Sequence, residues 1–441
     1  MNNRYEAASV DRKFLSPGVF VLLAFMAVGL VFIAARYIFG IGAVTHLSNE
    51  YPWGIWIGLD VAAGVALAAG GFTTGLLALV FHRDRYMTVV RPALVSAMLG
   101  YTFVVLALLV DTGRYWNIWR PIFHWNSRSV LFEVAMCVIL YLVVLYIEFI
   151  PIVTERFKNK VSFPGFLALL NGWGERLLSL ADSILGKGMW FFIIAGLVLS
   201  CLHQSSLGAL MLIAPQKVHP LWYTPILPLL FLLSAIAVGY PMVIIESVIT
   251  SKSFKREPEM DVLTPLAAFT PVLIGIYLVF KIGDIIGRGA FAFLFDGTFQ
   301  ANAFLVEMSF GLILPFILFL FRRVRQSPAW LFFASILYAG GVLLNRVNVF
   351  IVGYSPPFQI KSYFPAVGEI AITIGLISGL IFLYRVLVFI FPVLGTHGKK
   401  VVAKTLPVFL ISSMVFGIIF VPHSDAASES SGRFNRVEQF L

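Results

Sequence analysis

The stretch GMWFFIIAGLVLSCLHQSSLGALMLIA, residues 188–214, is long and apolar enough to cross a bilayer as one helix. A transmembrane helix needs about 20 such residues to span a hydrocarbon core of roughly 30 Å. His203 nevertheless lies deep inside the stretch, followed by Gln204, Ser205 and Ser206. A titratable imidazole in hydrocarbon is costly and usually functional, so we expect His203 to belong to a functional site. The alternative is a structural hydrogen bond between helices.

The whole chain repeats this pattern. Of its 441 residues 59% are hydrophobic and 12% are charged, a composition that excludes a soluble globular protein. It predicts an all-α, polytopic transmembrane helical bundle. The ten expected spans are residues 17–40, 54–80, 92–112, 129–152, 188–214, 223–249, 263–287, 302–321, 329–352 and 366–392.

The remaining segments fall outside these spans. Residues 163–185 have the pattern of an amphipathic helix lying on the membrane. Residues 406–421 are apolar but short, and are either an eleventh span or an interfacial helix. We therefore divide the chain into a membrane domain, residues 1–395, and a C-terminal extension, residues 396–441, with this apolar segment and a polar tail.

Basic residues predict the orientation. The loops on the N-terminal side carry 21 Lys and Arg residues, and those on the opposite side carry 8. The positive-inside rule therefore predicts a cytoplasmic N-terminus. It also accounts for the formal net charge of +10 without nucleic acid, which we do not expect as a partner.

Intramembrane charges sort by depth at about 1.5 Å per helical residue. Asp60, Asp111 and Glu133 fall in the same outer layer as His203. Three further charged residues lie at comparable depth on later spans: Glu307, Arg346 and Glu369. Glu148 and Glu246 lie in the cytoplasmic half. The sorting indicates an outer polar pocket with acids leading inward from it.

Span four adds a candidate proton route. Glu133, Cys137, Tyr141 and Glu148 follow one another at intervals of four, four and seven, which favours one helical stripe. The stripe extends roughly 22 Å between the two carboxyls, so Glu133, Tyr141 and Glu148 could carry protons. The alternative is that these groups satisfy one another as contacts between helices.

Other polar residues complete the expected pocket. Asp111 and Arg114 belong to DTGRYWNIWRPIFHW, which otherwise reads as an interfacial aromatic belt with snorkelling arginines. Asp60 shares a helical face with Trp53 and Trp56, and Tyr101 lies mid-span where it could donate to a carbonyl ligand.

Residue counts bear on cofactors. Cys137 and Cys201 are the two cysteines, too few for a Cys-ligated iron–sulfur cluster within this chain. Of seven histidines only His203 lies well inside a span, whereas a bis-histidine haem b needs a facing pair. We therefore expect no haem, no iron–sulfur cluster and no metal.

Several strings occur together in order along residues 15–395. They are PWGIWIGLD (52–60), RPAL (91–94), LGY (99–101), DTGRYW (111–116), SVLFEVAMC (129–137), HQSSLG (203–208), KVHPLW (217–222), and YFP (363–365) with Glu369. The chain thereby resembles the integral membrane subunits of hydrogenase-2 type nickel–iron hydrogenases, which belong to the NrfD or polysulfide reductase membrane subunit superfamily. Its C-terminal extension departs from that pattern.

The resemblance implies two four-helix bundles plus additional helices and a haem-free protein that reacts with menaquinone or ubiquinone. It also implies a bacterial inner membrane location. The implied partners are a periplasmic ferredoxin-like iron–sulfur subunit and the large and small subunits of a nickel–iron hydrogenase. Carried over by motif, the positions expected near quinone or on a proton route are Tyr101, Asp111, Glu133, His203 and Glu246.

Together these observations predict a subunit that passes electrons from the iron–sulfur partner to quinone. We assign quinone binding to His203, Asp111, Tyr101, Asp60, Gln204 and Arg114, and a proton pathway to Glu133, Glu148, Glu246 and Tyr141. The alternatives are an NrfD-type subunit of another periplasmic oxidoreductase complex, a proton-coupled transporter, or a scaffold that only anchors electron-transfer partners.

Overall fold

The chain folds into a bundle of membrane-length helices. The computed structural model describes residues 7–8, 13–157, 171–357, 359 and 361–395. Within these residues ten helical segments have the length and apolar character of membrane spans, which confirms the ten predicted from hydropathy. The predicted segment 406–421 lies outside the described residues.

The first four-helix bundle contains spans two to five. Span two consists of η2 (Trp56–Ala63), α2 (Gly64–Leu67), α3 (Gly70–Gly75) and η3 (Leu76–Val80). The other members are α4 (Met87–Asp111), α6 (Val130–Phe157) and α7 (Asn171–Leu210), which ends in η7 (Met211–Ile213). Helix α7 packs against α6 on one side and against α8 on the other.

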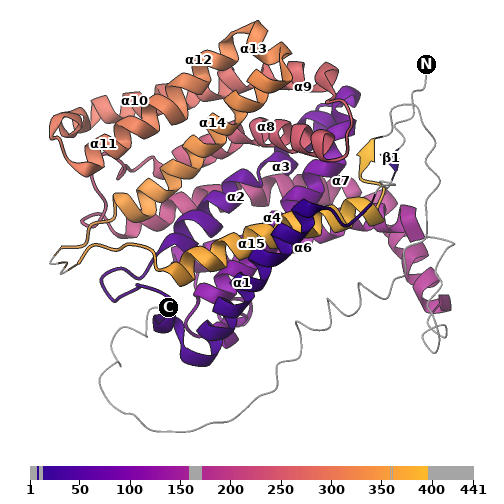
Figure 1. Cartoon of the computed structure of the whole chain (residues 1–441), viewed down its shortest axis with the longest axis horizontal. Coiled ribbons are helices and arrows are strands. Elements are labelled where there is room, and N and C mark those ends of the chain that lie inside the picture. The colour runs from indigo at the N-terminus through magenta and orange to yellow at the C-terminus, as the bar shows by residue number, and fades with distance from the viewer. Residues whose placement is uncertain (1–6, 9–12, 158–170, 358, 360, 396–441) are drawn as a thin grey trace.

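The second bundle contains spans six to nine and lies beside the first (Figure 1). It consists of α8 (Leu227–Ser253), α9 (Met260–Ala267), α10 (Thr270–Gly287), α11 (Phe299–Val306), η9 (Glu307–Ile313), α12 (Leu314–Leu320), α14 (Pro328–Val347) and η10 (Asn348–Val352). Since α8 packs against α7, α10 and α14, it joins the two bundles.

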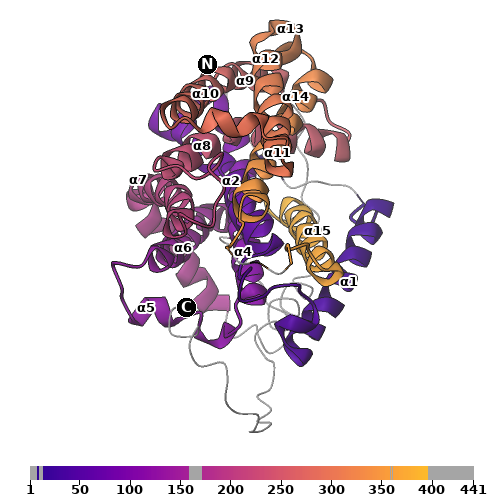
Figure 2. The same cartoon turned by 90° about the vertical axis from the view of Figure 1, so that its left-hand side faces the viewer.

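A pair of helices adds to the bundles. Helix α1 (Pro17–Phe39) packs along α15 (Val367–Ile390), and α15 in turn packs on α4 (Figure 2). Gly29 and Gly375 allow the close approach, because a Cβ on Gly29 would lie 2.8 Å from the Cα of Gly375. Small residues commonly bring membrane helices together in this way.

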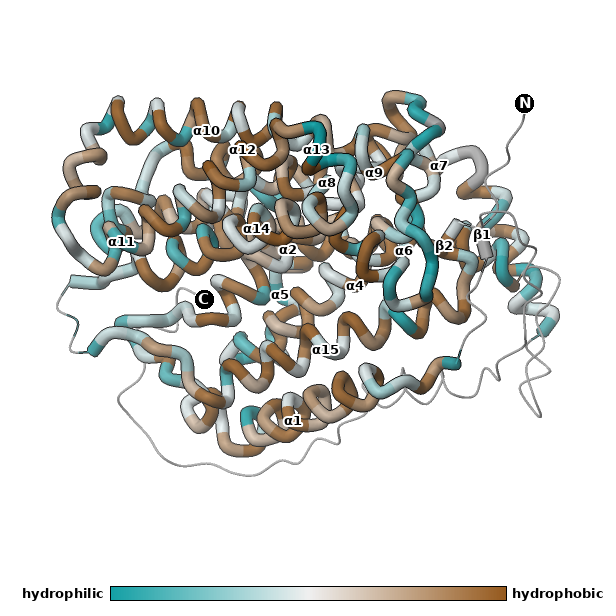
Figure 3. The backbone as a smooth tube through the Cα atoms, turned by 45° about the horizontal axis from the view of Figure 1, so that its top comes forward, coloured by the Kyte–Doolittle hydropathy of each residue, from teal (hydrophilic) through white to brown (hydrophobic). Residues whose placement is uncertain are grey.

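Short elements connect the spans. They are η1 (Ile41–Ala43), η4 (Asp84–Tyr86), η5 (Tyr115–Asn117), α5 (Arg120–Phe123), η8 (Ala290–Phe295), α13 (Arg322–Gln326), and the strands β1 (Ala7–Ala8) and β2 (Leu394–Gly395). The strands pair antiparallel and bring the two ends of the membrane domain together. Figure 3 shows apolar residues along the spans and a hydrophilic α13 at one end.

The segment before span five differs from its prediction as a separate surface helix. Residues 171–185 are the first part of α7, which runs for 40 residues without a break. At 1.5 Å per residue the helix is about 60 Å long, twice a hydrocarbon core. Residues 163–170 lie outside the described part of the chain.

Among the described residues, four helical segments are π-helical: η2, η3, η9 and η10. Such segments are rare and frequently mark functional sites. Asp60 lies within η2, Glu307 begins η9, and Asn348 begins η10. Buried charged or polar residues are therefore found where the regular helix is widened.

Adjacent glycines on α14 provide a test of the packing. A Cβ on Gly341 would overlap the backbone of Gly311, whereas a Cβ on Gly340 would meet no atom within 4 Å. We expect Gly341→Ala to destabilise the protein by about 1–3 kcal/mol through overpacking. Gly340→Ala should have a neutral or slightly stabilising effect, since Ala favours helix. Thermal unfolding in detergent measures both, and equal midpoints would contradict the close packing.

Candidate functional site

His203 lies in the core of the first bundle and is 1% exposed. Its Nδ1 is 3.2 Å from the hydroxyl of Tyr101 on α4, within hydrogen-bond distance. Gln204 is also fully buried and donates from Nε2 to the carbonyl of Val65, at 2.8 Å. The predicted residues His203, Tyr101 and Gln204 are thus brought together by α7, α4 and α2.

Two polar atoms of this site have no hydrogen-bond partner among the described residues, His203 Nε2 and Gln204 Oε1. Ser200, one turn earlier, is near enough to the hydroxyls of Tyr101 and Tyr141 to interact with them. An unsatisfied buried polar group costs about 1–3 kcal/mol, so two on neighbouring residues need an explanation. A ligand with both hydrogen-bond acceptor and donor character would satisfy them.

A line of polar residues leads from His203 toward the N-terminal end of α7. The ring of Tyr141 on α6 packs edge-on against Tyr101, with centroids 4.5 Å apart. Glu148 lies two turns further along α6 and faces Gly196, where a Cβ would come within 2.8 Å of its Oε1. Glu148 and Tyr141 therefore face α7 in the interior, as the predicted stripe requires.

Glu133 departs from that stripe. Its side chain is exposed in the first turn of α6, while Cys137 and Tyr141 are buried. Each step of four residues advances a helical face by about 40°, so Glu133 and Tyr141 are about 80° apart. Glu133 thus lies on the surface of the described chain and not in an interior pocket with His203.

Asp60 and Asp111 form a second cluster at the contact with α15. Asp60 Oδ2 accepts a hydrogen bond from the hydroxyl of Thr373, at 2.7 Å. Asp111 is near enough to Asp60, Glu369 and Arg36 to interact electrostatically, and its buried Oδ1 has no partner among the described residues. Asp111 follows Tyr101 by ten residues, or about 15 Å along α4, so the predicted single pocket is two clusters.

Glu369 organises the backbone around this second cluster. Its carboxylate accepts from the backbone N–H of Ala366, at 2.8 Å, and of His46, at 3.1 Å, and from the hydroxyl of Tyr363, at 2.5 Å. Burial and the hydrogen bond to Glu369 raise the pKa of Tyr363, which lies outside the spans, so its hydroxyl stays a donor. The indole of Trp56 donates to the Glu369 carbonyl, at 3.2 Å.

The two arginines near Asp111 differ. Arg36 is 3% exposed and donates to the carbonyls of Val110 and Thr112, both at 2.7 Å, so it caps the end of α4. Arg114 is exposed in the following loop, and the structure does not place it with His203 or Tyr101. Its predicted role in quinone binding therefore has no geometric support in the first cluster.

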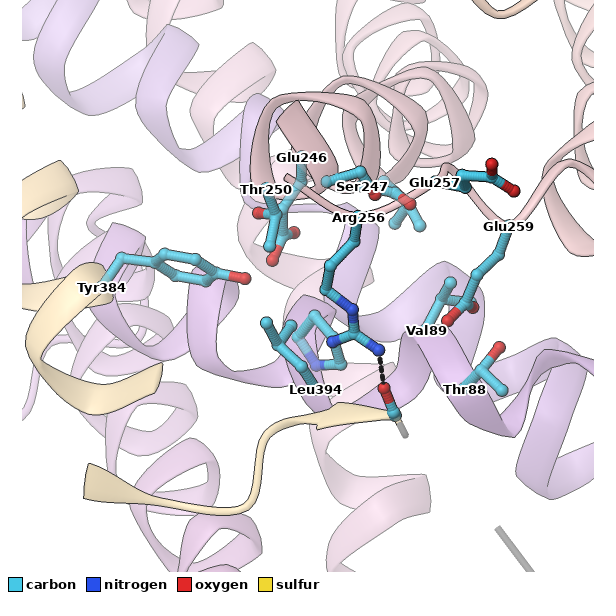
Figure 4. Close-up of a pocket in the computed structure, with 14 residues that line it drawn as sticks. Thr88, Val89, Glu246, Ser247, Thr250, Arg256, Glu257, Glu259, Tyr384 and Leu394 are labelled. Carbon is cyan, nitrogen blue, oxygen red and sulfur yellow. Dashed lines mark hydrogen bonds between the residues drawn. The ribbon is translucent and has the colours of Figure 1, made fainter. Parts of the chain in front are cut away.

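Glu246 lies in a separate pocket at the opposite end of the helices. The pocket opens between α4, α8 and β2 and is also lined by Thr88, Thr250, Arg256, Glu257, Glu259 and Tyr384 (Figure 4). Glu246 Oε1 is buried without a partner among the described residues. Arg256 donates to the carbonyl of Gly395, which ties β2 to the mouth. The pocket connects a buried acid with the protein surface.

Residue patterns alone did not indicate several members of these sites. Ser200 is one turn before His203, a spacing that could have identified it. Thr373 lies in the second turn of α15, in an apolar run, and has no comparable signal. It becomes part of the site because α15 packs against η2.

These features define a class: a multi-pass helical membrane protein with buried, incompletely satisfied polar sites inside its bundles. The chain matches the family described as "Polysulphide reductase, NrfD" over residues 43–357 and belongs to that family.

Individual relatives cover most of the chain. It is 36% identical to a protein of Nitratidesulfovibrio vulgaris, over 88% of this chain and 97% of the relative. It is 32% identical to the "Probable Ni/Fe-hydrogenase 2 b-type cytochrome subunit" of Escherichia coli, over 87% and 93%. Identity to the "Menaquinone reductase, integral membrane subunit" of Nitratidesulfovibrio vulgaris is 26%, over 74% and 79%.

The name of the second relative raises the question of haem. A b-type haem held by two histidines needs both on facing helices. Among the described residues the histidines are His46, His82, His124, His203 and His219, and His203 alone lies inside a span. Groups of three or more metal-ligating side chains are likewise not found in the described ranges. These residues do not fit a bis-histidine haem.

Thr373 provides a test of the second cluster. Thr373→Val preserves shape but removes the hydroxyl that donates to Asp60, so we expect a loss of about 1–3 kcal/mol in stability. Thr373→Ser keeps the hydroxyl and should remain closer to wild type. The measurement is the thermal unfolding midpoint in detergent; a valine variant as stable as wild type would contradict the hydrogen bond.

Proposed function

We propose that this chain transfers electrons between a redox partner and a membrane quinone of the menaquinone type. The observation that carries the proposal is the unpaired Nε2 of fully buried His203, next to the unpaired Oε1 of Gln204. The names of relatives, a hydrogenase-2 subunit and a menaquinone reductase subunit, support the same class of function.

The polar atoms around His203 suit both the quinone and the quinol form of the substrate. If the Tyr101 hydroxyl donates to Nδ1, the ring proton of His203 is on Nε2 and can donate to a quinone carbonyl. Gln204 Oε1 can accept from a quinol hydroxyl, since its Nε2 is held by Val65. In this proposal Tyr101, His203 and Gln204 orient the ring, and Asp60 and Asp111 exchange protons at the outer cluster.

Quinone reduction consumes two electrons and two protons, so a proton supply is needed. In the proposal Glu148 and Tyr141 carry protons along α6, Glu246 takes them up at its open pocket, and Glu133 exchanges them at the rim. If the protons are taken up from the side of the membrane opposite the electron donor, the reaction is electrogenic. Moving one charge across the membrane involves about 2.3 kcal/mol per 100 mV.

The proposed setting is the bacterial inner membrane with a cytoplasmic N-terminus. A ferredoxin-like iron–sulfur subunit, fed by the large and small subunits of a nickel–iron hydrogenase, would dock on the periplasmic face. Exposed aromatic residues in the loop after α4 suit such a contact; they are Tyr115, Trp116, Trp119, Phe123 and Trp125. In a second candidate function, the same subunit would serve another oxidoreductase complex, which the menaquinone reductase relative favours.

Substitution of His203 tests the quinone site. In the complex purified with its partner subunits, His203→Ala should lower the rate of menaquinone-analogue turnover by about tenfold or more, because a buried hydrogen bond to substrate is lost. Exposed His82, which has a positive φ of 52° that Asn tolerates, provides the control His82→Asn. If His203→Ala turns over quinone at the wild-type rate, the site assignment is wrong.

The proposal includes the absence of haem, which a spectrum tests. Dithionite-reduced minus oxidised spectra of the purified chain should lack the α-band of a b-type haem, because His203 has no facing histidine in the described spans. Pyridine haemochrome analysis quantifies any haem that copurifies. One haem per chain, lost in His203→Ala, would contradict the proposal and make His203 a haem ligand.

A further inference from the structure

Three buried charged side chains lie on neighbouring helices of the second bundle, away from His203 and from Glu246. Lys281 on α10, Glu307 on η9 and Arg346 on α14 are 1%, 4% and 0% exposed. Charged residues inside membrane spans are rare and usually functional. The groups around His203 in the first bundle are neutral. The charged cluster of the second bundle therefore needs its own explanation.

Glu307 has a full set of donors. Its Oε2 accepts from the indole of Trp222 and the amide of Asn348, each at 2.8 Å, and its Oε1 accepts from the amide of Asn345, at 2.7 Å. All three partners are N–H donors, so the carboxylate acts only as an acceptor towards them. Glu307 is therefore the acidic member of the cluster, held in place by these donors.

Arg346 is held through its two terminal nitrogens, while its Nε has no partner among the described residues. Its Nη1 donates to Asn345 Oδ1, at 2.7 Å, and its Nη2 donates to Ser234 Oγ, at 2.8 Å, and to the carbonyl of Phe231, at 3.1 Å. The guanidinium also lies 3.6 Å from the centroid of the Phe231 ring. Because arginine stays protonated in proteins, Arg346 compensates the charge of Glu307.

A second pair is found nearer the end of α10. Arg288 Nη2 is 2.7 Å from Asp284 Oδ2, and the hydroxyl of Thr224 donates to Asp284 Oδ1, at 2.5 Å. These charges also cancel. Lys281 is then the member of the cluster without a dedicated counter-ion.

The contacts of Lys281 agree with this charge count. Within the described part of the chain, no hydrogen bond or ion pair joins its ammonium to another residue, and Nζ lies 5.1 Å from the centroid of the Phe304 ring. Glu307 and Asp284 attract the ammonium, while Arg346 and Arg288 repel it. Burial in a low-dielectric interior opposes the charged form of a lysine, so Lys281 is the member of the cluster suited to a change of charge.

The position of Lys281 suits transfer between the interior and one surface. Tyr277, Lys281, Asp284 and Arg288 are spaced by four, three and four residues and so share one face of α10. At the inner end, Tyr277 and Glu307 line a small cavity together with Tyr338, whose hydroxyl has no partner among the described residues. At the other end, the Arg288 side chain is 25% exposed.

We propose that Lys281 is the proton-exchanging group of a second site, separate from His203, that opens to the surface through Asp284 and Arg288. In the release step an Nζ–H bond breaks, its electron pair stays on nitrogen, and the proton passes through water to the Asp284 end. In the return step the amine takes a proton from water on the side of Glu307 and Tyr338. The step involves no electron transfer, and the fixed charges balance when the amine is neutral.

Two substitutions of Lys281 test this inference, which rests on the proposed function only for its assay. Lys281→Met removes the titrating group, and Lys281→Arg keeps a permanent charge. In proteoliposomes containing the complex with its partner subunits, we expect both variants to turn over a menaquinone analogue within about twofold of wild type. Both should move about tenfold fewer protons across the membrane per quinone, because the proton-exchanging group is lost.

Controls separate the possible failures. Lys217→Met, in an exposed loop, should change neither quantity. If Lys281→Met does not assemble, Lys281→Arg decides, with its thermal unfolding midpoint as the check on folding. The inference is overturned if either assembled variant moves as many protons per quinone as the wild type. It is also overturned if the wild type turns over quinone without moving protons. A wild type without quinone turnover instead contradicts the proposed function.

Discussion

Water is excluded from the hydrocarbon core, and every polar group that enters it must find its partner within the protein. As helices, the spans pair their own backbone N–H and C=O groups, and buried side chains pair the backbone groups left over at the helix ends. Arg36 caps the carbonyls at the end of α4, and Glu369 accepts from backbone N–H groups before α15. Against this background, an unpaired atom such as His203 Nε2 is an exception that requires a functional account.

The two bundles meet this constraint with different chemistry. The first surrounds His203 with neutral groups that can donate or accept hydrogen bonds, which suits an uncharged substrate such as a quinone. The second places the Arg288–Asp284 ion pair, Glu307 and Arg346 around Lys281, which suits a change of charge. Helix α8 packs against helices of both bundles, so the two sites belong to one continuous helical assembly.

Helices α1 and α15 contribute more than an outer layer. The hydrogen bond from Thr373 to Asp60 connects α15 to the π-helical part of span two, and Glu369 and Tyr363 order the adjoining loop. At the opposite end, β1 and β2 pair beside the pocket that contains Glu246. The cluster of Asp60 and Asp111 and the pocket that contains Glu246 are thus both completed by segments from the ends of the membrane domain.

Hydropathy and length alone determined the ten spans, because a helix in lipid satisfies its own backbone whatever its neighbours are. The sequence also identified His203, Tyr101 and Gln204, since polar residues in apolar runs are conspicuous. Only the tertiary structure decided which of them meet. Spacing placed Glu133 on a stripe with Tyr141, but the helical turn leaves it exposed. The roles of Thr373 and Lys281 depend on charges and partners contributed by other helices, which no local pattern encodes.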